Sequence, residues 1–512
     1  MRFFLFVFLM AAGMAPFAHG QAVGVCGNGA EPELIARLLE NKAALAAQGP
    51  SFIQNREIKY VPIRFILVAK ADGSGRAAIT KIFDQVCGLN EDFADQNIQF
   101  FLKDAGYVLL DNDQVYEKNY LTTILMRRNK DANAINVYVV GDASPREKNP
   151  DEEGVTLGYF NPVEDWLVIR KEELNGISTT LSHELGHFFS LAHTHSGWDA
   201  TPWDASVYEG KPVPKTSPGG IPTEKMDRSN CDGSGDFLCD TPPDYNFGFA
   251  WGTCNFTANA LDPDGVRVDP QETNIMGYFL RCEANTYQFT QEQKALMATD
   301  LASNRRRAIR QVDPGNVGDI GQPVLLSPAK DEVTPFYNEV TFSWQPVPNA
   351  TFYLLEIDRV PSFSISPFQY IVTDTTYTTN ELVGNRRYYW RIRPMNGANV
   401  CNSLNTGSIV FRTGGTTSTE WMDQVQSWSV FPNPSQGYDQ INIRLQLLSD
   451  LEVGVQVADL TGRQLKWIPM RRYPAGNHIV EVSVADLPSG VYLISLVDPA
   501  RQIETRRLVV TR

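Results

Sequence analysis

The sequence predicts a multidomain protein, in which an α/β domain built on a twisted mixed sheet is followed by two β-sandwich domains. The chain has 512 residues, which is more than one hydrophobic core accommodates and predicts about three domains. Strand and helix patterns alternate from about residue 58 to 310, whereas only short alternating strands separated by turn residues follow residue 321. A hydrophobic content of 43% and a charged content of 20% are typical of globular domains.

The N-terminus predicts a signal peptide over residues 1–20. Arg2 supplies the positive start, residues 3–17 the apolar run, and residues 18–20 a small-residue cleavage site. This run is shorter than the ~20 apolar residues that a membrane span requires, and no other stretch approaches that length. We therefore expect export and no transmembrane segment. The formal net charge of -14 argues against a nucleic-acid partner and fits a secreted, acid-rich protein.

Residues 56–312 carry the α/β pattern. A helix is predicted at residues 77–93. Strands are predicted at residues 60–68, 98–102, 134–140, 158–160 and 166–170. The last two come just before a histidine-rich helix, and a strand left there at the sheet edge could bind an extended peptide through backbone hydrogen bonds.

Four of the six histidines fall within thirteen consecutive positions: His183, His187, His193 and His195. On a helix, His183 and His187 project from one face and can ligate one ion. Glu184 stands beside that face, where a carboxylate can reach a metal-bound water without being a ligand. His193 can become a third ligand only if the chain turns near Ser190. Three imidazoles leave one tetrahedral position of zinc open, as catalysis requires. An isolated H-E-x-x-H also occurs by chance on ordinary helices, but the third histidine argues against chance.

Export allows the seven cysteines to be interpreted as disulfides. Four of them lie between residues 231 and 282. The preferred pairing is Cys231 with Cys239 and Cys254 with Cys282, although three pairings remain open.

Cys26 lies in a partly helical leader, residues 21–55, which we interpret as a pro-segment. Because a thiolate is a good zinc ligand, Cys26 could occupy the open position of the metal and keep the protein latent until the leader is cut. The alternatives are a disulfide with Cys87 or an unbonded thiol.

A long segment rich in Gly, Pro and Asp, residues 194–273, needs disulfides or ions to order it. Within it, residues 235–242 supply carboxylates and turn carbonyls suited to calcium, although solvated acidic loop residues explain this stretch equally well. Met276 and Tyr278 follow, and a helix is predicted to begin near Thr290.

Together these motifs resemble the metzincin zinc endopeptidases of the pappalysin branch, over roughly residues 55 to 310. The resemblance implies that His183, His187 and His193 bind zinc and that Glu184 is the general base and acid. It also implies a methionine floor at Met276, an oxyanion-stabilising or zinc-approaching Tyr278, and structural calcium at Asp236, Asp240 and Thr241.

Two features depart from the pattern of that family. Ser190 stands where the motif has glycine, at a turn that favours a left-handed backbone, with a cost of about 1 kcal/mol. Arg281 and the apolar Phe279 and Leu280 stand where relatives that cleave before arginine carry acidic residues. This argues against an arginine-accepting pocket and leaves cleavage next to apolar or acidic side chains open.

The C-terminal part predicts two β domains. Residues 321–414 contain strands at 340–344, 352–357, 388–393 and 409–412, and their pattern resembles a fibronectin type III domain. Trp344 and Trp390 are expected in its core. Residues 425–512 resemble the C-terminal sorting domain of Bacteroidetes type IX secretion substrates, which implies the outer-membrane secretion machinery as a partner and a secreted or cell-surface location.

Two functions remain in view. The first is a secreted zinc endopeptidase acting on extracellular proteins and peptides. The alternative is a catalytically inactive surface adhesin that uses the same fold and the sandwich for binding. The intact histidines, Glu184 and Tyr278 argue against the adhesin, since a decayed site would be expected to lose one of them.

Overall fold

The chain folds into two compact units. The structure, a computed structural model, describes residues 24–27, 32–48, 57–147, 155–249, 251–365, 367–401, 407–415, 422, 424–435, 437–460, 463–499 and 503–511. The predicted signal peptide lies outside these residues. The first unit comprises Met1–Gly321, Asn349–Thr351 and Met395–Ser403, and the second comprises Gln322–Pro348, Phe352–Pro394 and Leu404–Arg512. Residues 395–401, which the sequence pattern placed in the first sandwich, therefore pack within the first unit.

The first unit is built on a six-stranded mixed sheet with the strand order β1-β5-β6-β4-β2-β3. Its strands are β1 (Gly24–Cys26), β2 (Lys59–Ala69), β3 (Ile98–Asp111), β4 (Ile135–Val140), β5 (Val155–Asn161) and β6 (Trp166–Arg170). The strands β3, β2, β4 and β6 are parallel neighbours, and β5 runs antiparallel to β6. Every residue of β4 is buried, as its continuous apolar run predicts. The predicted mixed sheet is confirmed.

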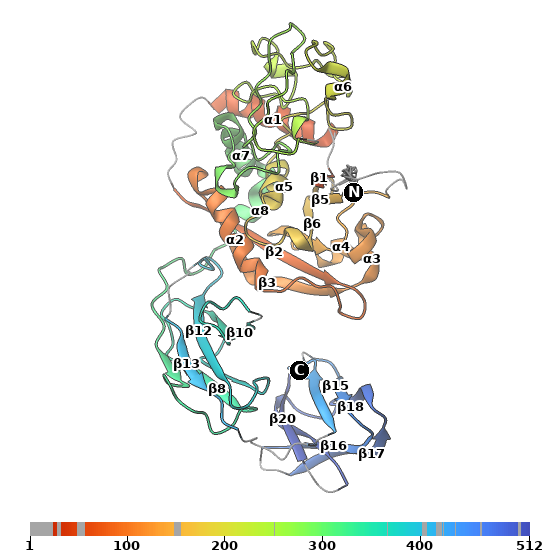
Figure 1. Ribbon diagram of the computed structural model, residues 1–512, viewed down its shortest axis with the longest axis vertical. Coiled ribbons are helices and arrows are strands. Elements are labelled where there is room, and N and C mark those ends of the chain that lie inside the picture. The colour runs from red at the N-terminus through yellow and green to blue at the C-terminus, as the bar shows by residue number, and fades with distance from the viewer. Residues whose placement is uncertain are drawn as a thin grey trace, which may run out of the picture. The chain divides into compact units, whose positions relative to one another are not determined.

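The first unit also contains helices, several of which pack on the sheet. They are α1 (Pro32–Gln48), α2 (Lys81–Asp92), α3 (Asp113–Lys118), α4 (Thr123–Asn129), α5 (Thr180–Phe188), α6 (Ala205–Tyr208), α7 (Gln291–Ala302) and α8 (Arg307–Arg310). The histidine helix α5 packs on β5 and β6, while α1 packs against α7 (Figure 1). At the start of α7, Thr290 and Gln293 form a reciprocal capping box, which fixes where this helix begins.

The strand next to α5 is not left open at the sheet edge. The outer side of β5 pairs in parallel with β1, with Cys26 aligned opposite Gly158. The amide of Gly27 continues the ladder by donating to the carbonyl of Gly158 at 2.8 Å. The N-terminal leader thus uses the backbone edge that the sequence suggested for an extended peptide.

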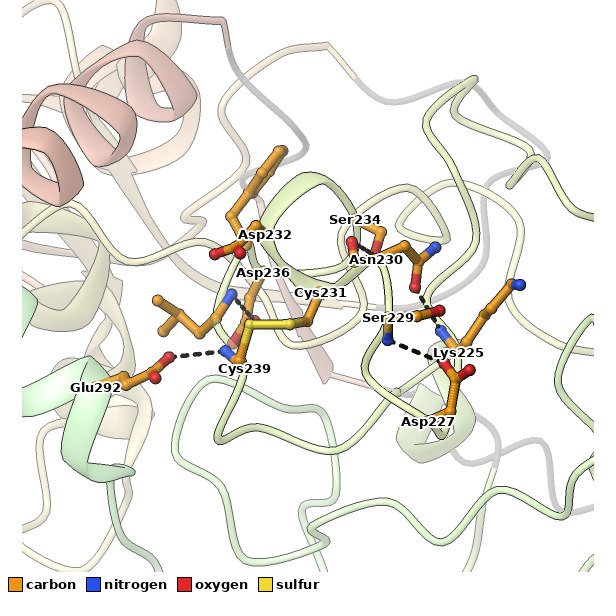
Figure 2. The surroundings of a disulfide bond; sticks show 12 residues. Lys225, Asp227, Ser229, Asn230, Cys231, Asp232, Ser234, Asp236, Cys239 and Glu292 are labelled. Atoms are coloured by element: carbon orange, nitrogen blue, oxygen red, sulfur yellow. Dashed lines mark hydrogen bonds between the residues drawn. A yellow bond between two sulfur atoms is a disulfide. The ribbon is translucent and has the colours of Figure 1, made fainter.

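The predicted irregular segment after α5 is held by disulfides and an aromatic cluster. Two bonds join Cys231 to Cys239 and Cys254 to Cys282. Figure 2 shows the first of these, with Glu292 of α7 accepting a 2.7 Å hydrogen bond from the backbone amide of Cys239. The buried aromatic side chains of this segment include Trp198, Trp203, Tyr245, Phe247, Phe256 and Phe279. This cluster supplies the core that helices and strands supply elsewhere.

A third disulfide joins Cys87 of α2 to Cys401, which are 314 residues apart in the sequence. In the same region, the amide of Leu102 donates to the carbonyl of Gly397 at 2.8 Å. The pairing excludes the alternative in which Cys87 bonds to Cys26, and Cys26 forms no disulfide. The sequence predicted no partner for Cys401, since the two cysteines come from distant segments.

The second unit contains two β sandwiches. In the first, the sheet β10-β9-β12-β13 faces the sheet β11-β8-β7, and the ring of Phe342 in β8 lies 5.2 Å from that of Trp390 in β12. In the second, the sheets β14-β15-β18 and β17-β16-β19-β20 share one aliphatic core. The strands are β7 (Leu325–Ser327), β8 (Val340–Trp344), β9 (Phe352–Asp358), β10 (Phe368–Val372), β11 (Thr376–Thr379), β12 (Arg387–Met395), β13 (Ile409–Arg412), β14 (Val425–Phe431), β15 (Gln440–Leu447), β16 (Leu451–Ala458), β17 (Gln464–Tyr473), β18 (Gly476–Ser483), β19 (Gly490–Val497) and β20 (Ile503–Val510).

Both tryptophans expected in the core of the first sandwich are buried, Trp344 at 2% exposure and Trp390 at 0%. The predicted order of one mixed-sheet domain followed by two β sandwiches is confirmed. Within the described part of the chain, no helix has the length and apolar character needed to cross a membrane.

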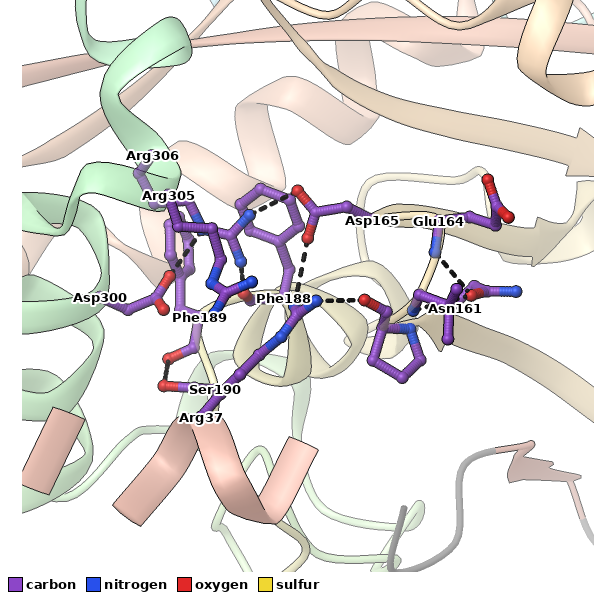
Figure 3. A network of polar contacts seen from close by, with 12 residues as sticks. Arg37, Asn161, Glu164, Asp165, Phe188, Phe189, Ser190, Asp300, Arg305 and Arg306 are labelled. Atoms are coloured by element: carbon purple, nitrogen blue, oxygen red, sulfur yellow. Dashed lines mark hydrogen bonds and ion pairs between the residues drawn. The ribbon is translucent and has the colours of Figure 1, made fainter. Parts of the chain in front are cut away.

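A buried arginine connects the C-terminal end of α5 to the surrounding helices. Arg306, which is 1% exposed on its side chain, donates to Asp300 at 2.6 Å and to Asp165 at 2.7 Å, and also bonds the carbonyl of Phe188. Arg37 of α1 reaches the same Asp165 at 3.3 Å (Figure 3). Two carboxylates, a helix end and the leader are therefore coupled through one guanidinium.

We predict that Arg306→Gln lowers the free energy of unfolding of the first unit by about 3–5 kcal/mol, because it leaves the buried carboxylate of Asp300 without its charge partner. Urea denaturation measures the change. The neighbouring Arg305→Gln is the matched control, since the side chain of Arg305 is 42% exposed and its ion pair with Glu40 is long, at 3.9 Å. Its effect on the free energy of unfolding should stay within about 0.5 kcal/mol. Equal effects of the two variants would contradict the assigned role.

Candidate metal and catalytic site

The helix α5 ends where the chain must turn to bring the third histidine back. Ser190 has a φ of 71°, in the left-handed region, and the amide of Leu191 donates to the carbonyl of Gly186 at 2.9 Å. This turn lies where the sequence required one. The Ser190 hydroxyl donates to the carbonyl of Phe189 at 2.6 Å and accepts from the amide side chain of Asn41 at 2.7 Å. These bonds offset part of the strain of a non-glycine residue at this position.

The three candidate zinc ligands each direct Nδ1 at an oxygen atom. The acceptor of His183 is the carbonyl of Ile275 at 2.6 Å, and that of His187 is the carbonyl of Leu191 at 2.8 Å. His193 contacts the carboxylate of Asp199 at 2.6 Å. Because a carbonyl or carboxylate oxygen accepts, each Nδ1 must carry the proton. Each Nε2 therefore presents a lone pair.

These lone pairs converge on one point. The Nε2 atoms of His187 and His193 are 3.1 Å apart, and Nε2 of His183 is buried without a hydrogen-bond partner. Ligand atoms of the three histidines and Cys26 all lie within 4.8 Å of one another. Burial lowers the pKa of His183 and His187 well below the ordinary imidazole value, which keeps both rings neutral. Neutral nitrogens that face one another with no proton between them fit a shared cation.

Glu184 places a buried carboxylate beside this point. The side chain is 0% exposed, and burial raises its pKa to about 8, against the opposing effects of the Cys26 thiol and the Phe160 backbone. The strand β5 can approach it because residue 158 is glycine. A Cβ atom there would lie 3.2 Å from Cγ of Glu184 and 3.0 Å from the carbonyl oxygen of Val168. The arrangement places a carboxyl group that can take up or release a proton near neutral pH beside the histidines and β5.

Met276 lies directly beneath α5. It is 0% exposed, and a Cβ atom on Gly186 would come within 2.2 Å of its sulfur, so the helix can pass only with glycine at that position. The turn is held by the side chain of Asn274, which accepts from the amide of Met276 at 2.9 Å, and Gln293 of α7 bonds Asn274 in turn. The same turn supplies the carbonyl of Ile275 that orients His183, so floor and ligand are fixed together.

Tyr278, which directly follows Gly277, projects its side chain into the site. Its hydroxyl donates to the backbone carbonyl of Cys26 at 3.1 Å and lies 3.4 Å from Nε2 of His193. Burial raises the pKa of Tyr278 well above its ordinary value, and the neighbouring Cys26 and Asp199 add to this effect. The phenol therefore stays protonated and can donate a hydrogen bond. The thiol of Cys26 lies 3.5 Å from Nε2 of His187.

Asp199, which orients His193, was not predicted from the sequence. Burial alone would raise the pKa of this carboxyl, but the hydrogen bond from His193 lowers it to about 2, so it is ionised. His195, noted in the sequence only as part of the cluster, stacks on His193 with ring centroids 4.7 Å apart. The closeness of Asp199 to the histidines in the sequence is the one signal that could have found it, but its contact with His193 depends on the turn between them.

The candidate calcium residues lie in the segment held by disulfides. Asp236 and Thr241 are each 1% exposed, and buried oxygens of Asp236, Asp240 and Thr241 have no hydrogen-bond partner. A fourth residue, Glu224, was not predicted. It is 3% exposed, and neither of its carboxylate oxygens is hydrogen-bonded.

Without a bound cation, two of these buried carboxyls favour the protonated form. Burial and then Asp236 raise the pKa of Glu224 to about 10, and burial raises that of Asp236 to about 8. Buried oxygens of this kind fit a hard cation. Among the residues that the structure describes, Glu224, Asp236 and Asp240 do not form a compact group of three ligand atoms, in contrast to the histidine site. Backbone or threonine oxygens would have to complete a calcium site.

The Nε2 atoms of three neutral imidazoles converge on one point, and the carboxyl group of Glu184 lies beside it. This arrangement is typical of metal-dependent hydrolases. Comparison with known proteins gives the family. The chain is 30% identical over 247 residues to an extracellular metalloprotease of Neurospora crassa, in a match that covers 41% of this chain and 82% of that protein. The chain belongs to this family of extracellular metalloproteases, in agreement with the pappalysin resemblance of its motifs.

One further relative and one similar solved structure were found. An extracellular metalloprotease of Sordaria macrospora is 27% identical over 311 residues, covering 54% of this chain and 97% of that protein. Among solved structures, a mutant of promirolysin from Tannerella forsythia is 17% identical, covering 56% of this chain and 97% of that chain with a TM-score of 0.37.

Residues 429–511 match the secretion system C-terminal sorting domain. This confirms the type IX sorting tail that the sequence motifs indicated, and with it a secreted or cell-surface location. The protein is thus an exported metalloprotease.

Proposed function

We propose that the protein is a zinc-dependent endopeptidase of the metzincin class that hydrolyses peptide bonds of extracellular proteins. The observation that supports this most directly is the convergence of three Nε2 lone pairs beside the buried carboxylate of Glu184. His183, His187 and His193 would hold the ion. Bound zinc would supply a Lewis acid that acidifies water and polarises a peptide carbonyl.

Residues of the chain would carry out proton transfer, oxyanion stabilisation and alignment of the substrate. Glu184 accepts the proton of the attacking water and later gives it to the departing amine. Tyr278, protonated by virtue of its raised pKa, donates a hydrogen bond to the oxyanion that develops on the carbonyl. The edge of β5 aligns the substrate backbone beside Glu184. An inactive adhesin would not need these groups, and the presence of all of them favours the peptidase.

We predict that Glu184→Gln reduces peptide cleavage by at least about 10²-fold, because the amide cannot accept the proton of the attacking water. Zinc content should remain at one ion per chain, since residue 184 is not a ligand in this proposal. Cleavage of a quenched peptide and metal analysis of the same sample measure the two effects. A variant that lost zinc would contradict the separation of roles, and one that retained full activity would contradict the base.

We propose further that the leader keeps the site latent. Cys26 supplies the thiol nearest to the histidine nitrogens, its backbone carbonyl engages the hydroxyl of Tyr278, and β1 covers the edge of β5. The helix α1 holds this strand in place, since Asn41 bonds Ser190 and Asp300, and Arg37 bonds Asp165. The leader thus blocks the fourth metal position, the oxyanion donor and the peptide-binding edge at once.

We predict that unprocessed Cys26→Ala cleaves peptides faster than the unprocessed wild-type chain but more slowly than the processed enzyme, because β1 still covers the edge of β5. Removing the sulfur frees the position beside His187 that a water must take. Cleavage is followed while mass spectrometry verifies that the leader is intact. Cys26→Ser serves as the size-matched control and should also be active. If both variants remain inactive until the leader is cut, strand β1 rather than the thiol would be the source of latency.

We also propose a structural calcium ion held by Asp236, Asp240 and Thr241, with Glu224 added to the predicted set. The support is that their buried oxygens lack partners and that burial and the neighbouring Asp236 raise the pKa of Glu224, an effect that a bound cation would oppose. A hard ion would neutralise both carboxylates and order a segment that has few helices or strands of its own.

We predict that calcium raises the thermal midpoint of the wild-type chain and that Glu224→Gln loses most of this rise. At a calcium concentration of 100 times Kd the stabilisation would be about 2.7 kcal/mol. Differential scanning calorimetry with and without calcium measures it. Asp232→Asn is the matched control, because Asp232 lies in the same segment but its side chain is 86% exposed. No response of the wild type to calcium would contradict the site.

A further inference from the structure

The pocket that adjoins Glu184 has an apolar wall. Its lining, besides the catalytic groups, includes Leu157, Thr180, Ile275, Phe279, Leu280 and Tyr287. It opens between α5, β5 and the loop after Met276. A substrate peptide placed with its scissile carbonyl near Glu184 and Tyr278 would direct a neighbouring side chain into this space.

No lining residue offers a charge to a substrate side chain. Among the described residues that line this pocket, Glu184 is the only carboxylate and His183 the only basic group, and both belong to the candidate metal and catalytic site. The carboxylate of Glu173 lies close by but accepts hydrogen bonds from the hydroxyls of Ser178 at 2.6 Å and Thr180 at 2.7 Å, and it is not part of the lining. A charged side chain would therefore lose its hydration without gaining a partner.

The wall is held rigidly by the loop that carries it. Phe279 is 1% exposed and belongs to the aromatic cluster of the irregular segment. Tyr287 bonds the backbone carbonyl of Phe279 and accepts from the amide of Cys282 at 3.2 Å. The disulfide between Cys254 and Cys282 fixes the middle of this loop. Leu280, at 44% exposure, stands at the mouth.

We propose that this protease selects substrates with an apolar side chain, aliphatic or aromatic, next to the scissile bond, and that Leu280 and Tyr287 determine this specificity. The inference rests on the proposed endopeptidase function and adds the substrate class. It differs from cleavage at arginine, which would need an acidic wall, and from cleavage at acidic residues, which would need a cationic one.

The test uses the full-length chain after removal of its leader, incubated with a peptide library with and without a zinc chelator. Cut sites are read by mass spectrometry. The expected result is chelator-sensitive cleavage with Leu, Ile, Val, Met or Phe enriched at least about tenfold over Arg, Lys, Asp and Glu at one position flanking the cut. Enrichment of basic or acidic residues there would overturn the specificity and leave the peptidase standing. Absence of any chelator-sensitive cleavage would overturn both.

Variants at the mouth test the assigned residue. Leu280→Asp should raise kcat/KM for peptides with Arg or Lys at the flanking position relative to Leu, by at least about tenfold. Leu280→Asn separates the added charge from the lost apolar surface and should weaken the apolar preference without creating a basic one. Leu121→Asp, at a leucine that is 69% exposed in the same unit, should retain the wild-type pattern. An unchanged preference in Leu280→Asp would overturn the role of Leu280.

Discussion

The orientation of three imidazole rings by three oxygen atoms is the constraint on which the site depends. The oxygens come from separate places: the turn before Met276, the turn after α5, and Asp199. Each fixes a tautomer and a ring plane, and together they turn every Nε2 toward one point. The left-handed turn at Ser190, the glycine at position 186 and the capping box of α7 are all needed to bring those oxygens within reach. The surrounding fold thus supplies geometry, while the histidines supply chemistry.

The leader and a substrate would compete for the same backbone edge. A strand of only three residues is a weak element by itself, but α1 ties β1 to the first unit through Arg37 and Asn41. Tethering makes the contact intramolecular, so weak local bonds suffice to hold it. Cutting the chain between β1 and α1 would remove that advantage while leaving α1 itself bound. The network around Arg306 belongs to the folded unit, and its pairs to Asp165 and Asp300 do not depend on β1.

The sequence predicted the parts of the site that depend on local spacing. His183 and His187 are one helical turn apart, and the glycine-like turn at Ser190 follows from the distance to His193. The roles of Met276 and Tyr278 could be predicted only from the resemblance of the motifs to a known family. Their distance from the histidine helix in the sequence follows no helical or strand period. Asp199 and Glu224 were missed, because their partners are set by how an irregular segment packs around disulfides and aromatic rings. The strand β1 was missed because three residues show no pattern, and its pairing with β5 is a tertiary event.

The bond between Cys87 and Cys401 has a consequence for the order of assembly. The first unit includes residues that follow most of the first sandwich in the sequence, so it is not a contiguous piece of chain. The disulfide that closes this unit cannot form until residue 401 has been synthesised and has reached an oxidising compartment. Maturation of the metalloprotease is therefore coupled to completion of a later domain. If the chain were cut near residue 315, the parts before and after the cut would stay covalently joined through the bond between Cys87 and Cys401.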